Sequence, residues 1–304
     1  SALYSPWTPL EDIVIDFLQS KRDPMRLKAW VNTTLGECYE EQGERIDEYD
    51  LLDRKEYYAD DIPEGVLVLC AGVDVQDDRL AYEILGVGKG EETWSIAYDE
   101  IYGDPSSEEL WSLLDEVLDQ TFVHPKRGEE IVRATCIDSG GHYTQKVYDY
   151  VRDRRGKRRF AIKGVGGEGK PIAGKYSTNN IGKIKLFPVG TDTAKELIFA
   201  RLKIREEGAG YCHFPIERGE EYFRMLTSVK KVTRYFKGRP RREWIKVRQR
   251  NEALDCRVYA LAALQLIGVN LDALARKPTP EPKTKRNLVN RRGNLGRSNF
   301  VTGY

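Results

Sequence analysis

Three consecutive apolar runs between Val66 and Gly103 constrain the fold more than any other feature of this chain. The runs are VLVLCAGVDVQ, RLAYEILGVGK and ETWSIAYDEIYG, and all three are rich in β-branched and aromatic residues. Only Asp77 and Asp78 separate the first run from the second, and a short turn around Gly90 separates the second from the third. Short polar connections of this kind are typical of antiparallel hairpins. The sequence therefore predicts three adjacent strands in one sheet.

The order of the remaining segments predicts how that sheet continues. An amphipathic helix at 106–122 is followed by a strand that ends in Asp138, a helix at 144–154 and a strand at 158–165. A helix at 191–204, a short strand at 211–214, a hairpin at 229–247 and an apolar helix at 251–268 complete the pattern. This order predicts an α/β fold, an RNase H/RuvC-like mixed sheet flanked by helices, with a basic β-hairpin. The domain is expected at 62–272, and the Pro-, Lys- and Arg-rich stretch 273–304 is expected to be a disordered tail.

Composition excludes several classes of protein. Five cysteines without a CxxC pair and three scattered histidines favour reduced thiols over a disulfide framework or a zinc cluster. No apolar run is long enough to cross a bilayer, so no membrane partner is expected. The net charge is only +1, but residues 230–250 hold ten Lys and Arg against one acid, Glu243. This uneven distribution favours a polyanionic partner.

Asp74 is an unusual residue for its position, because it lies inside an apolar strand. A buried carboxylate without a partner costs several kcal/mol, so such a strand needs a cation, a metal or an open end. Asp138 ends a second strand, and Asp255 lies in the first turn of the apolar helix. If the two strands are neighbours, Asp74 and Asp138 lie about 5 Å apart and repel each other unless they share a cation. An oxygen-only set of ligands suits two Mg²⁺ or Mn²⁺ ions that assist phosphodiester hydrolysis. The catalytic and metal-binding residues are thus expected to be Asp74, Asp138 and Asp255.

Each of these acids also has a simpler interpretation. Asp74 is compatible with the first position of a turn, since VDVQDDRL contains three Asp. Asp138 is compatible with the N-cap of the next helix, and Asp255 with a charge that complements a helix dipole. The metal site is favoured by the combination of the three, each on a suitable element.

A basic hairpin is the second candidate site. The segment RYFKGRPRREWIKVRQR interleaves aromatic and basic residues, which suits salt-sensitive binding to the phosphates of DNA. The alternative is a solvated hairpin whose charge prevents aggregation. A second basic run, RDRRGKRR at 152–159, is expected to flank a duplex together with the hairpin. Ser139 and His142 are expected to support the metal site rather than to act as nucleophiles, and a solvated edge lysine is the simpler reading of Lys163. The predicted DNA-binding residues are Arg239, Arg241, Arg242, Lys246, Arg248 and Lys163.

Several long, colinear motifs resemble one known family. GVDVQDDRL, WSIAYDEIYGDP, CIDSGGHYTQKVYDYVR, AIKGVGG, VGTDTAKELIFARL and NEALDCRVYALAAL are similar to the nuclease domain of lambda-type phage terminase large subunits. AWVNTTLGECYEEQGE resembles the segment that joins the packaging ATPase to the nuclease in that family. Residues 1–61 are accordingly expected to be a linker and the end of the ATPase region. No Walker A motif is present in the sequence, so the ATPase motor itself is not expected in it.

The resemblance implies an endonuclease that cuts concatemeric viral double-stranded DNA into genome lengths during packaging. The three metal-binding acids of the family fall on Asp74, Asp138 and Asp255. The implied partners are double-stranded DNA, a small terminase subunit, the capsid portal and the ATPase domain of the same full-length chain. The implied location is the host cytoplasm.

Three rival functions remain open from the sequence. A junction resolvase or transposase-like enzyme would use the same acids but give resolved junctions or joined strands. An actin-like kinase needs a glycine-rich turn after its first aspartate, and VQDDR has none. A non-catalytic DNA-binding module would keep its acids for structure, so it would bind DNA without cutting it. An acidic stretch, 37–61, is either a solvated linker or an arm that competes with DNA for the basic hairpin.

Overall fold

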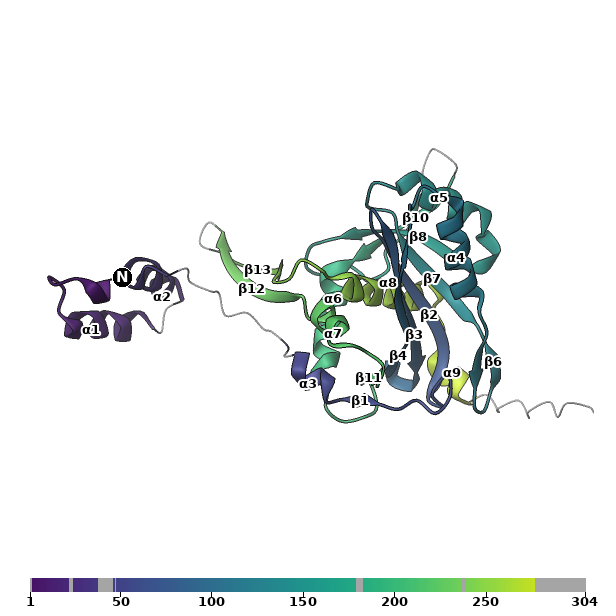
Figure 1. Cartoon of the computed structure of the whole chain (residues 1–304), viewed down its shortest axis with the longest axis horizontal. Helices are drawn as coiled ribbons and strands as arrows, with labels where there is room; N and C mark the ends of the chain where they lie inside the picture. The colour runs from purple at the N-terminus through teal and green to yellow at the C-terminus, as the bar shows by residue number, and fades with distance from the viewer. Residues whose placement is uncertain are drawn as a thin grey trace, which may run out of the picture.

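A nine-stranded mixed sheet forms the centre of the molecule (Figure 1). The structure is a computed structural model that describes residues 2–21, 24–37, 46, 48–178, 183–236 and 239–276. The strand order in the sheet is β1-β11-β4-β3-β2-β7-β8-β10-β9. The three predicted strands are β2 (Val66–Val75), β3 (Arg79–Gly88) and β4 (Thr93–Tyr102), which pair antiparallel as expected.

Three further strands extend the sheet from β2 in parallel. β7 (Val132–Asp138) pairs with β2, β8 (Arg159–Val165) pairs with β7, and β10 (Lys185–Gly190) pairs with β8. The sequence did not predict β10, because Pro188 and the lysines before it interrupt the apolar pattern. The other members are short: β1 (Lys55–Glu56), β9 (Ser177–Thr178) and β11 (Cys212–Pro215). The predicted α/β fold with a mixed sheet is confirmed.

Helices cover both faces of this sheet. One face packs against α4 (Glu108–Asp119) and α5 (Thr144–Asp153), and the other packs against α6 (Thr191–Leu202), α7 (Glu220–Leu226) and α8 (Glu252–Ile267). The predicted helix at 106–122 is α4, and the Ser107 hydroxyl caps its start by accepting a hydrogen bond of 3.4 Å from the Leu110 amide. The arrangement gives three layers, with α8 lying across β2, β3 and β7.

The alternation of side chains along β2 decides which residues face α8. Val68 and Cys70 belong to the core beneath α8, whereas Leu69, Ala71 and Val73 belong to the core beneath α4 and α5. Because successive strand residues point to opposite faces, Asp74 points toward the α8 side. The same alternation places Asp138 on that side, since Ala134 and Cys136 pack there.

The α8 helix lies unusually close to the backbone of β2. A Cβ atom added to Gly72 would lie 1.9 Å from the Cys256 carbonyl oxygen and 2.6 Å from the Ala260 nitrogen. Any side chain at this position would collide with the helix backbone. Gly72 therefore sets how deeply the first turn of α8, and with it Asp255, is seated on the sheet.

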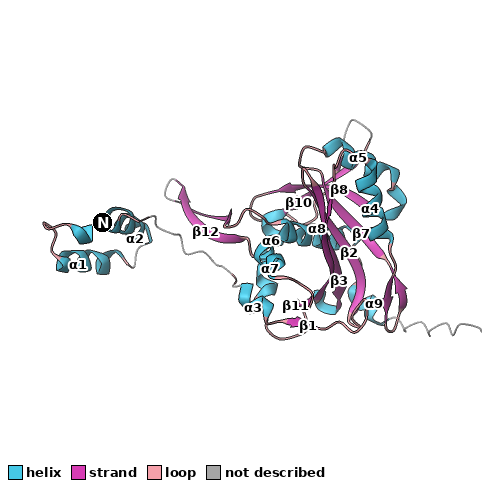
Figure 2. Cartoon of the chain, in the orientation of Figure 1, coloured by secondary structure: helices cyan, strands magenta, loops and turns pink. Residues whose placement is uncertain are grey.

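The remaining elements lie around this body. The hairpin consists of β12 (Val229–Phe236) and β13 (Arg239–Lys246), which Figure 2 shows as a ribbon separate from the main sheet. The N-terminal part contains η1 (Ala2–Tyr4), α1 (Leu10–Ser20), α2 (Pro24–Trp30), the π-helical η2 (Val31–Leu35) and α3 (Glu48–Leu52). Smaller elements are η3 (Lys89–Glu91), η4 (Arg155–Lys157), and the hairpin of β5 (Phe122–His124) and β6 (Gly128–Glu130).

The last described element is α9 (Leu271–Arg276), which runs past the predicted domain boundary at 272. Most of the predicted tail, 277–304, lies outside the described residues. Among the helices that are described, none is long and apolar enough to span a membrane.

Candidate functional site

Two of the three predicted acids lie near the C-terminal ends of neighbouring parallel strands. Val73 of β2 pairs with Ile137 of β7, and Asp74 and Asp138 are the next residue on each strand. Adjacent strands lie about 4.8 Å apart, so the two carboxylates start from neighbouring backbone positions on the α8 face. The third acid, Asp255, comes from the first turn of α8, directly before the residue whose carbonyl contacts Gly72. The structure thus gathers the three predicted acids from β2, β7 and α8.

Burial and mutual repulsion raise the pKa of these carboxyl groups. The pKa of Asp74 lies well above its usual value because the group is buried, and because Asp255 and Asp138 repel its charge. Burial also raises the pKa of Asp138, and Asp255 adds to the effect. The pKa of Asp255 is raised by burial, although Lys195 and Lys246 act in the opposite direction.

The three acids also shift the pKa of Tyr259. Burial raises the pKa of the Tyr259 hydroxyl, and the charges of Asp255, Asp138 and Asp74 raise it further. Tyr259 lies one turn after Asp255 on α8. A single buried hydroxyl is therefore within electrostatic range of all three acids.

The chemistry of the donor set fits a hard divalent cation. Gln76 Nε2 donates to Asp74 Oδ2 at 2.5 Å, the Gly140 amide donates to Asp138 Oδ1 at 3.1 Å, and Asn251 Nδ2 donates to Asp255 Oδ2. Carboxylate oxygens with few competing donors are the ligands that Mg²⁺ and Mn²⁺ prefer. Across the described ranges, no three acidic, His or Cys side chains are placed closely enough to form a finished metal site. An ion would therefore have to draw the three carboxylates together.

The two residues predicted to support the site have different positions. Ser139 is buried, and both its amide and its hydroxyl donate to the Ile162 carbonyl, at 2.9 and 2.7 Å. This residue therefore ties the end of β7 to β8. His142 is exposed and its Nδ1 lies 2.8 Å from Asp77 Oδ1, which raises the pKa of the imidazole. His142 thus contacts the turn after β2 instead of the acids.

Sequence reasoning missed a network of charges at the start of α8. Arg79 Nη2 lies 2.5 Å from Glu252 Oε1, and Arg79 Nε lies 3.1 Å from Glu100 Oε2. Arg250 pairs with the same two carboxylates. Hydrogen bonds and the two arginines lower the pKa of Glu252 despite its burial. Glu252, in the NEALD motif, was the only visible signal, because Arg79 lies far away in the sequence on β3, and Arg250, although two residues from Glu252, also pairs with the distant Glu100.

Lysines near the acids were only partly foreseen. Lys163 is exposed, and its charge partly offsets the raised pKa of Asp138. Lys246 donates to Asn251 Oδ1 at 2.7 Å, and its charge partly offsets the raised pKa of Asp255. Lys195 of α6 was not singled out, since it looks like an ordinary helix-surface lysine in the sequence. These lysines place positive charge beside the acids without a close ion pair to them among the described contacts.

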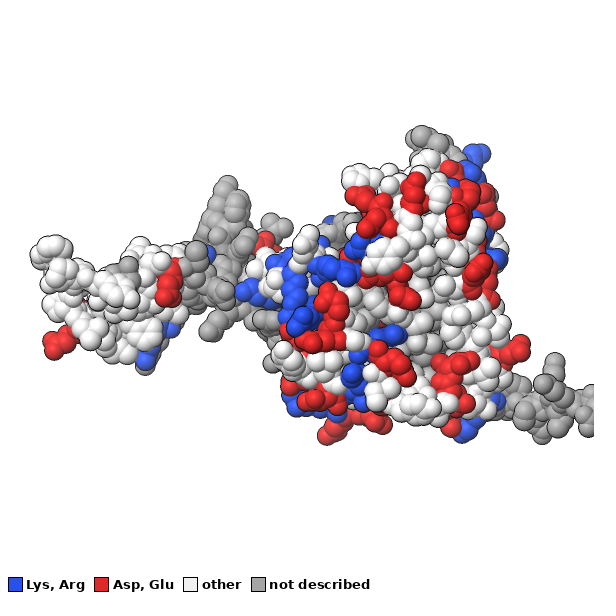
Figure 3. Space-filling model, viewed as in Figure 1, with Lys and Arg blue, Asp and Glu red and all other residues white. Residues whose placement is uncertain are grey.

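The hairpin packs on the α8 side of the sheet. Trp244 of β13 packs on Phe199 of α6 with ring centroids 4.8 Å apart, and Lys231 pairs with Glu196 of α6. Arg242 is exposed, whereas the side chains of Arg239 and Arg241, and the turn at 237–238, lie outside the description. Figure 3 shows basic side chains gathered over α6, α7 and the base of the hairpin.

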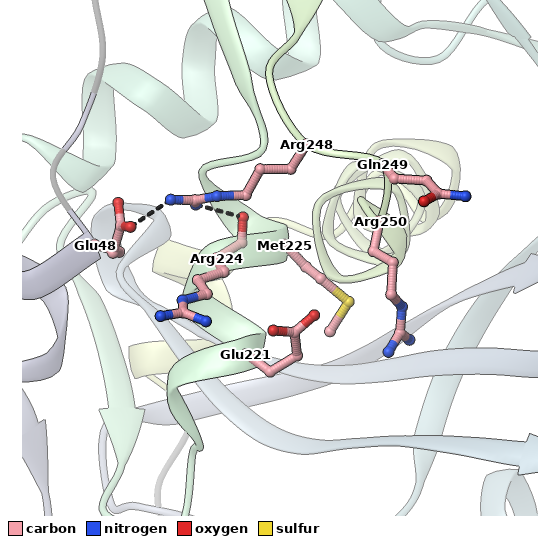
Figure 4. Close-up of a pocket in the computed structure, with 7 residues that line it drawn as sticks. All are labelled: Glu48, Glu221, Arg224, Met225, Arg248, Gln249 and Arg250. Atoms are coloured by element: carbon pink, nitrogen blue, oxygen red, sulfur yellow. Dashed lines mark hydrogen bonds and ion pairs between the residues drawn. The ribbon is translucent and has the colours of Figure 1, made fainter.

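Arg248 is partly buried and hydrogen-bonded to the protein. It pairs with Glu48 of α3, and its Nη1 donates to the Arg224 carbonyl at 3.0 Å and to Thr227 Oγ1 at 3.2 Å. These residues line part of a pocket of about 350 Å³, where Figure 4 shows Arg248 reaching toward Glu48. The described part of the acidic stretch 37–61 thus contacts Arg248, and its Asp50 contacts Arg205 at 3.0 Å.

The second basic run lies on the opposite face of the sheet from the hairpin, so the structure does not support the prediction that the two flank one duplex. Arg154 and Arg159 pair with Asp115 of α4, and Arg159 also pairs with Asp119. The run therefore belongs to the face covered by α4 and α5, while the hairpin belongs to the face covered by α6 and α8. Sequence proximity to Asp138 was misleading, because α5 carries the chain back toward the start of the parallel strands.

Comparisons with known proteins agree on one family. The family model for the "Terminase large subunit gpA, endonuclease domain" matches residues 1–277. The chain is 37% identical over 273 residues to the terminase large subunit of Escherichia phage lambda, and 35% identical over 272 residues to that of Enterobacteria phage P21. Each match covers 86% of this chain and 42% of the relative, so the chain spans about two fifths of the length of these relatives. No solved structure matches the chain.

Proposed function

The chain belongs to the family of the terminase large subunit gpA endonuclease domain, and on that premise we propose that it is a metal-dependent endodeoxyribonuclease. Its substrate would be concatemeric viral double-stranded DNA, which it would cut during genome packaging. The observation that carries the proposal is the convergence of Asp74, Asp138 and Asp255 on one face of the sheet, with the pKa of each raised. Buried acids of this kind are stable in ionised form only beside a cation.

Each residue of the candidate site would have a separate role. Asp74, Asp138 and Asp255 would hold one or two Mg²⁺ or Mn²⁺ ions, which neutralise the attacking and leaving oxygens of phosphodiester hydrolysis. Gln76 and Asn251 would orient the carboxylates through their hydrogen bonds to Asp74 and Asp255. Arg79 and Arg250 would keep Glu252 ionised and fix the start of α8.

The partners follow from family membership as proposals. The full-length protein would supply an ATPase domain, and a small terminase subunit and the capsid portal would recruit the nuclease to DNA in the host cytoplasm. The basic surface over α6 and the hairpin is on the same face of the sheet as the acids, so a duplex lying on that surface would bring a phosphate to them. Arg248 would have a structural role, because its guanidinium pairs with Glu48 and donates a hydrogen bond to Thr227.

Metal dependence is the direct test of the proposed chemistry. Plasmid cleavage by the purified chain is expected with Mg²⁺ or Mn²⁺ and is expected to disappear in excess EDTA, returning when metal is added back. Calorimetric titration with Mn²⁺ gives a readout that does not depend on cleavage. Because burial raises the pKa of these carboxyl groups, metal binding should release protons, and the number released should increase as the pH is lowered. Full cleavage in EDTA would refute the proposal.

Charge reversal on the hairpin tests the DNA surface separately. Arg241→Glu with Arg242→Glu is expected to weaken binding to any duplex, and to flatten the plot of log affinity against log salt by about one unit per lost phosphate contact. Binding is measured by fluorescence anisotropy with two unrelated duplexes over a range of salt concentrations. The control is Arg205→Glu, which changes an exposed arginine that lies off the hairpin. A loss confined to one DNA sequence would contradict phosphate-driven binding.

A further inference from the structure

A second pocket lies on the opposite face of the sheet from the acids. It has a volume of about 430 Å³ and lies at the start of β7 and β8, beside the end of α4. Arg159 pairs in register with Thr135, whereas Asp138 pairs with Ile162, three residues further along each strand. At about 3.3 Å per residue the pocket lies roughly 10 Å from the acids along the strands, with the sheet between them. It is therefore not part of the cleavage site.

The walls of this pocket are basic and part of its lining is apolar. Leu118, Ile131 and Val132 supply apolar surface, and Ile131 is 49% exposed. Arg133, Lys157 and Arg158 are exposed cations on the walls. Beneath them the buried Arg159 is held by Asp115 and Asp119, so its charge is already neutralised.

Arg158 differs from the other cations of the pocket in its backbone conformation and in its contacts. Its φ of 52° is left-handed, which is unfavourable for a residue with a side chain, and its carbonyl accepts a hydrogen bond of 3.1 Å from the Thr135 amide. Its guanidinium has no partner among the described contacts. The neighbouring cations already have partners, Arg133 with Glu130 and Lys157 with Asp119, but both cation side chains are half exposed. Ion pairs that are open to solvent contribute little to stability and can exchange for a ligand.

The surroundings favour a narrow anion over a duplex. Two carboxylates already pair with cations of the pocket, Asp119 with Lys157 and Arg159, and Glu130 with Arg133. A duplex needs a broad positive track, and among the described residues the lining of this pocket offers only three exposed cations. Nor does a sugar-phosphate backbone offer an apolar group to fill the surface formed by Leu118, Ile131 and Val132.

From this combination we propose that the pocket docks a short acidic peptide segment of a partner protein, with one apolar side chain seated against Ile131 and Val132. The acidic side chains of the segment pair with Arg158, Arg133 and Lys157. Charge complementarity and the apolar lining together specify this occupant. The inference does not depend on the cleavage chemistry, because none of these residues contacts the acids on the α8 face.

The test uses a fluorescein-labelled twelve-residue peptide of Glu and Asp with one central Leu, titrated with the whole chain and followed by anisotropy. Arg158→Gly removes the guanidinium and suits the left-handed backbone, so it leaves the fold intact. It is expected to weaken peptide binding about tenfold, the equivalent of one charge-assisted hydrogen bond. The matched control, Arg205→Gly, removes an exposed arginine elsewhere and should leave binding unchanged.

Two further measurements distinguish an acidic peptide from a DNA duplex as the ligand of this pocket. Replacing the central Leu of the peptide by Ser should weaken binding, and an unlabelled 20-base-pair duplex should not displace the peptide from the wild-type chain. Plasmid cleavage by Arg158→Gly should equal that of the wild type. Absence of peptide binding to the wild-type chain would overturn the proposal. So would an Arg158→Gly variant that loses affinity for the duplex as much as for the peptide, since the pocket would then be a DNA contact.

Discussion

Asp74→Asn is expected to lower plasmid cleavage about a thousandfold while the chain stays folded. Asparagine keeps the size of the side chain but removes the charge that an ion needs, and a lost metal contact removes several kcal/mol of transition-state stabilisation. The measurement is the initial rate of supercoiled-plasmid cleavage at saturating Mn²⁺. Asp77→Asn is the matched control, because Asp77 lies in the turn after β2 with 74% of its side chain exposed. Wild-type cleavage by Asp74→Asn would mean that the acids have a structural role only.

The same variant has a stability signature that depends on pH. Because the pKa of Asp74 is raised above its unfolded value near 3.9, the folded chain binds that proton more tightly than the unfolded chain. The resulting stability is fully present below the unfolded pKa and is lost as pH rises through the folded pKa. In EDTA, Asp74→Asn should therefore unfold at higher urea concentration than the wild type at pH 8, and the difference should shrink toward pH 4. Equal midpoints at both pH values would contradict the raised pKa.

Arg257→Ala is expected to destabilise the domain by about 3–5 kcal/mol. Arg257 of α8 and Glu83 of β3 are both almost fully buried, with Nη2 and Oε1 2.9 Å apart, and the Tyr222 hydroxyl donates to the same Glu83 oxygen at 2.6 Å. Removing the guanidinium leaves the Glu83 carboxylate buried without its counter-ion. Urea unfolding measures the loss. Arg224→Ala is the control, since its pair with Glu220 is about half exposed and should contribute only about 0.5 kcal/mol.

A double variant separates stability from positioning. Glu83→Leu with Arg257→Met replaces the ion pair by apolar groups of similar volume, which is often neutral or stabilising. Glu83 pairs in register with Gly72, and Arg257 follows Asp255 by two residues, so the pair links the seat of α8 to the third acid. If the pair only stabilises the fold, the double variant should cleave DNA normally. If it also positions Asp255, the variant should be stable and slow, with a higher Mn²⁺ requirement and unchanged affinity for DNA.

The parts of the fold that the sequence predicted are those with strong local patterns. The hairpins of β2, β3 and β4 follow from their apolar runs, rich in β-branched and aromatic residues, and from their short turns. β10 was missed because its parallel partner is distant in the sequence and Pro188 weakens its pattern. The short α7 was missed because seven residues are too few for a clear helical period.

Within the candidate site the same distinction applies. Asp74 and Asp138 were visible because a carboxylate in a β-strand is anomalous, and the structure confirms that their strands are neighbours. Lys195 and the arginines around Glu252 look ordinary in the sequence. Their roles arise only when elements that are distant in the sequence pack together. The run at 152–159 was misplaced for the converse reason: closeness in sequence to Asp138 says nothing about the face of the sheet on which the chain returns.

The seating of α8 against Gly72 has a consequence for the order of events during synthesis. Asp74 and Asp138 are translated before Asp255, which belongs to the last long helix and follows most of the sheet in the sequence. At about 5–20 residues per second, roughly ten seconds or more separate the first acid from the third. A nascent chain therefore holds at most two of the three acids until α8 is translated. On the proposed function, the nuclease would stay inactive until its last long helix has been translated.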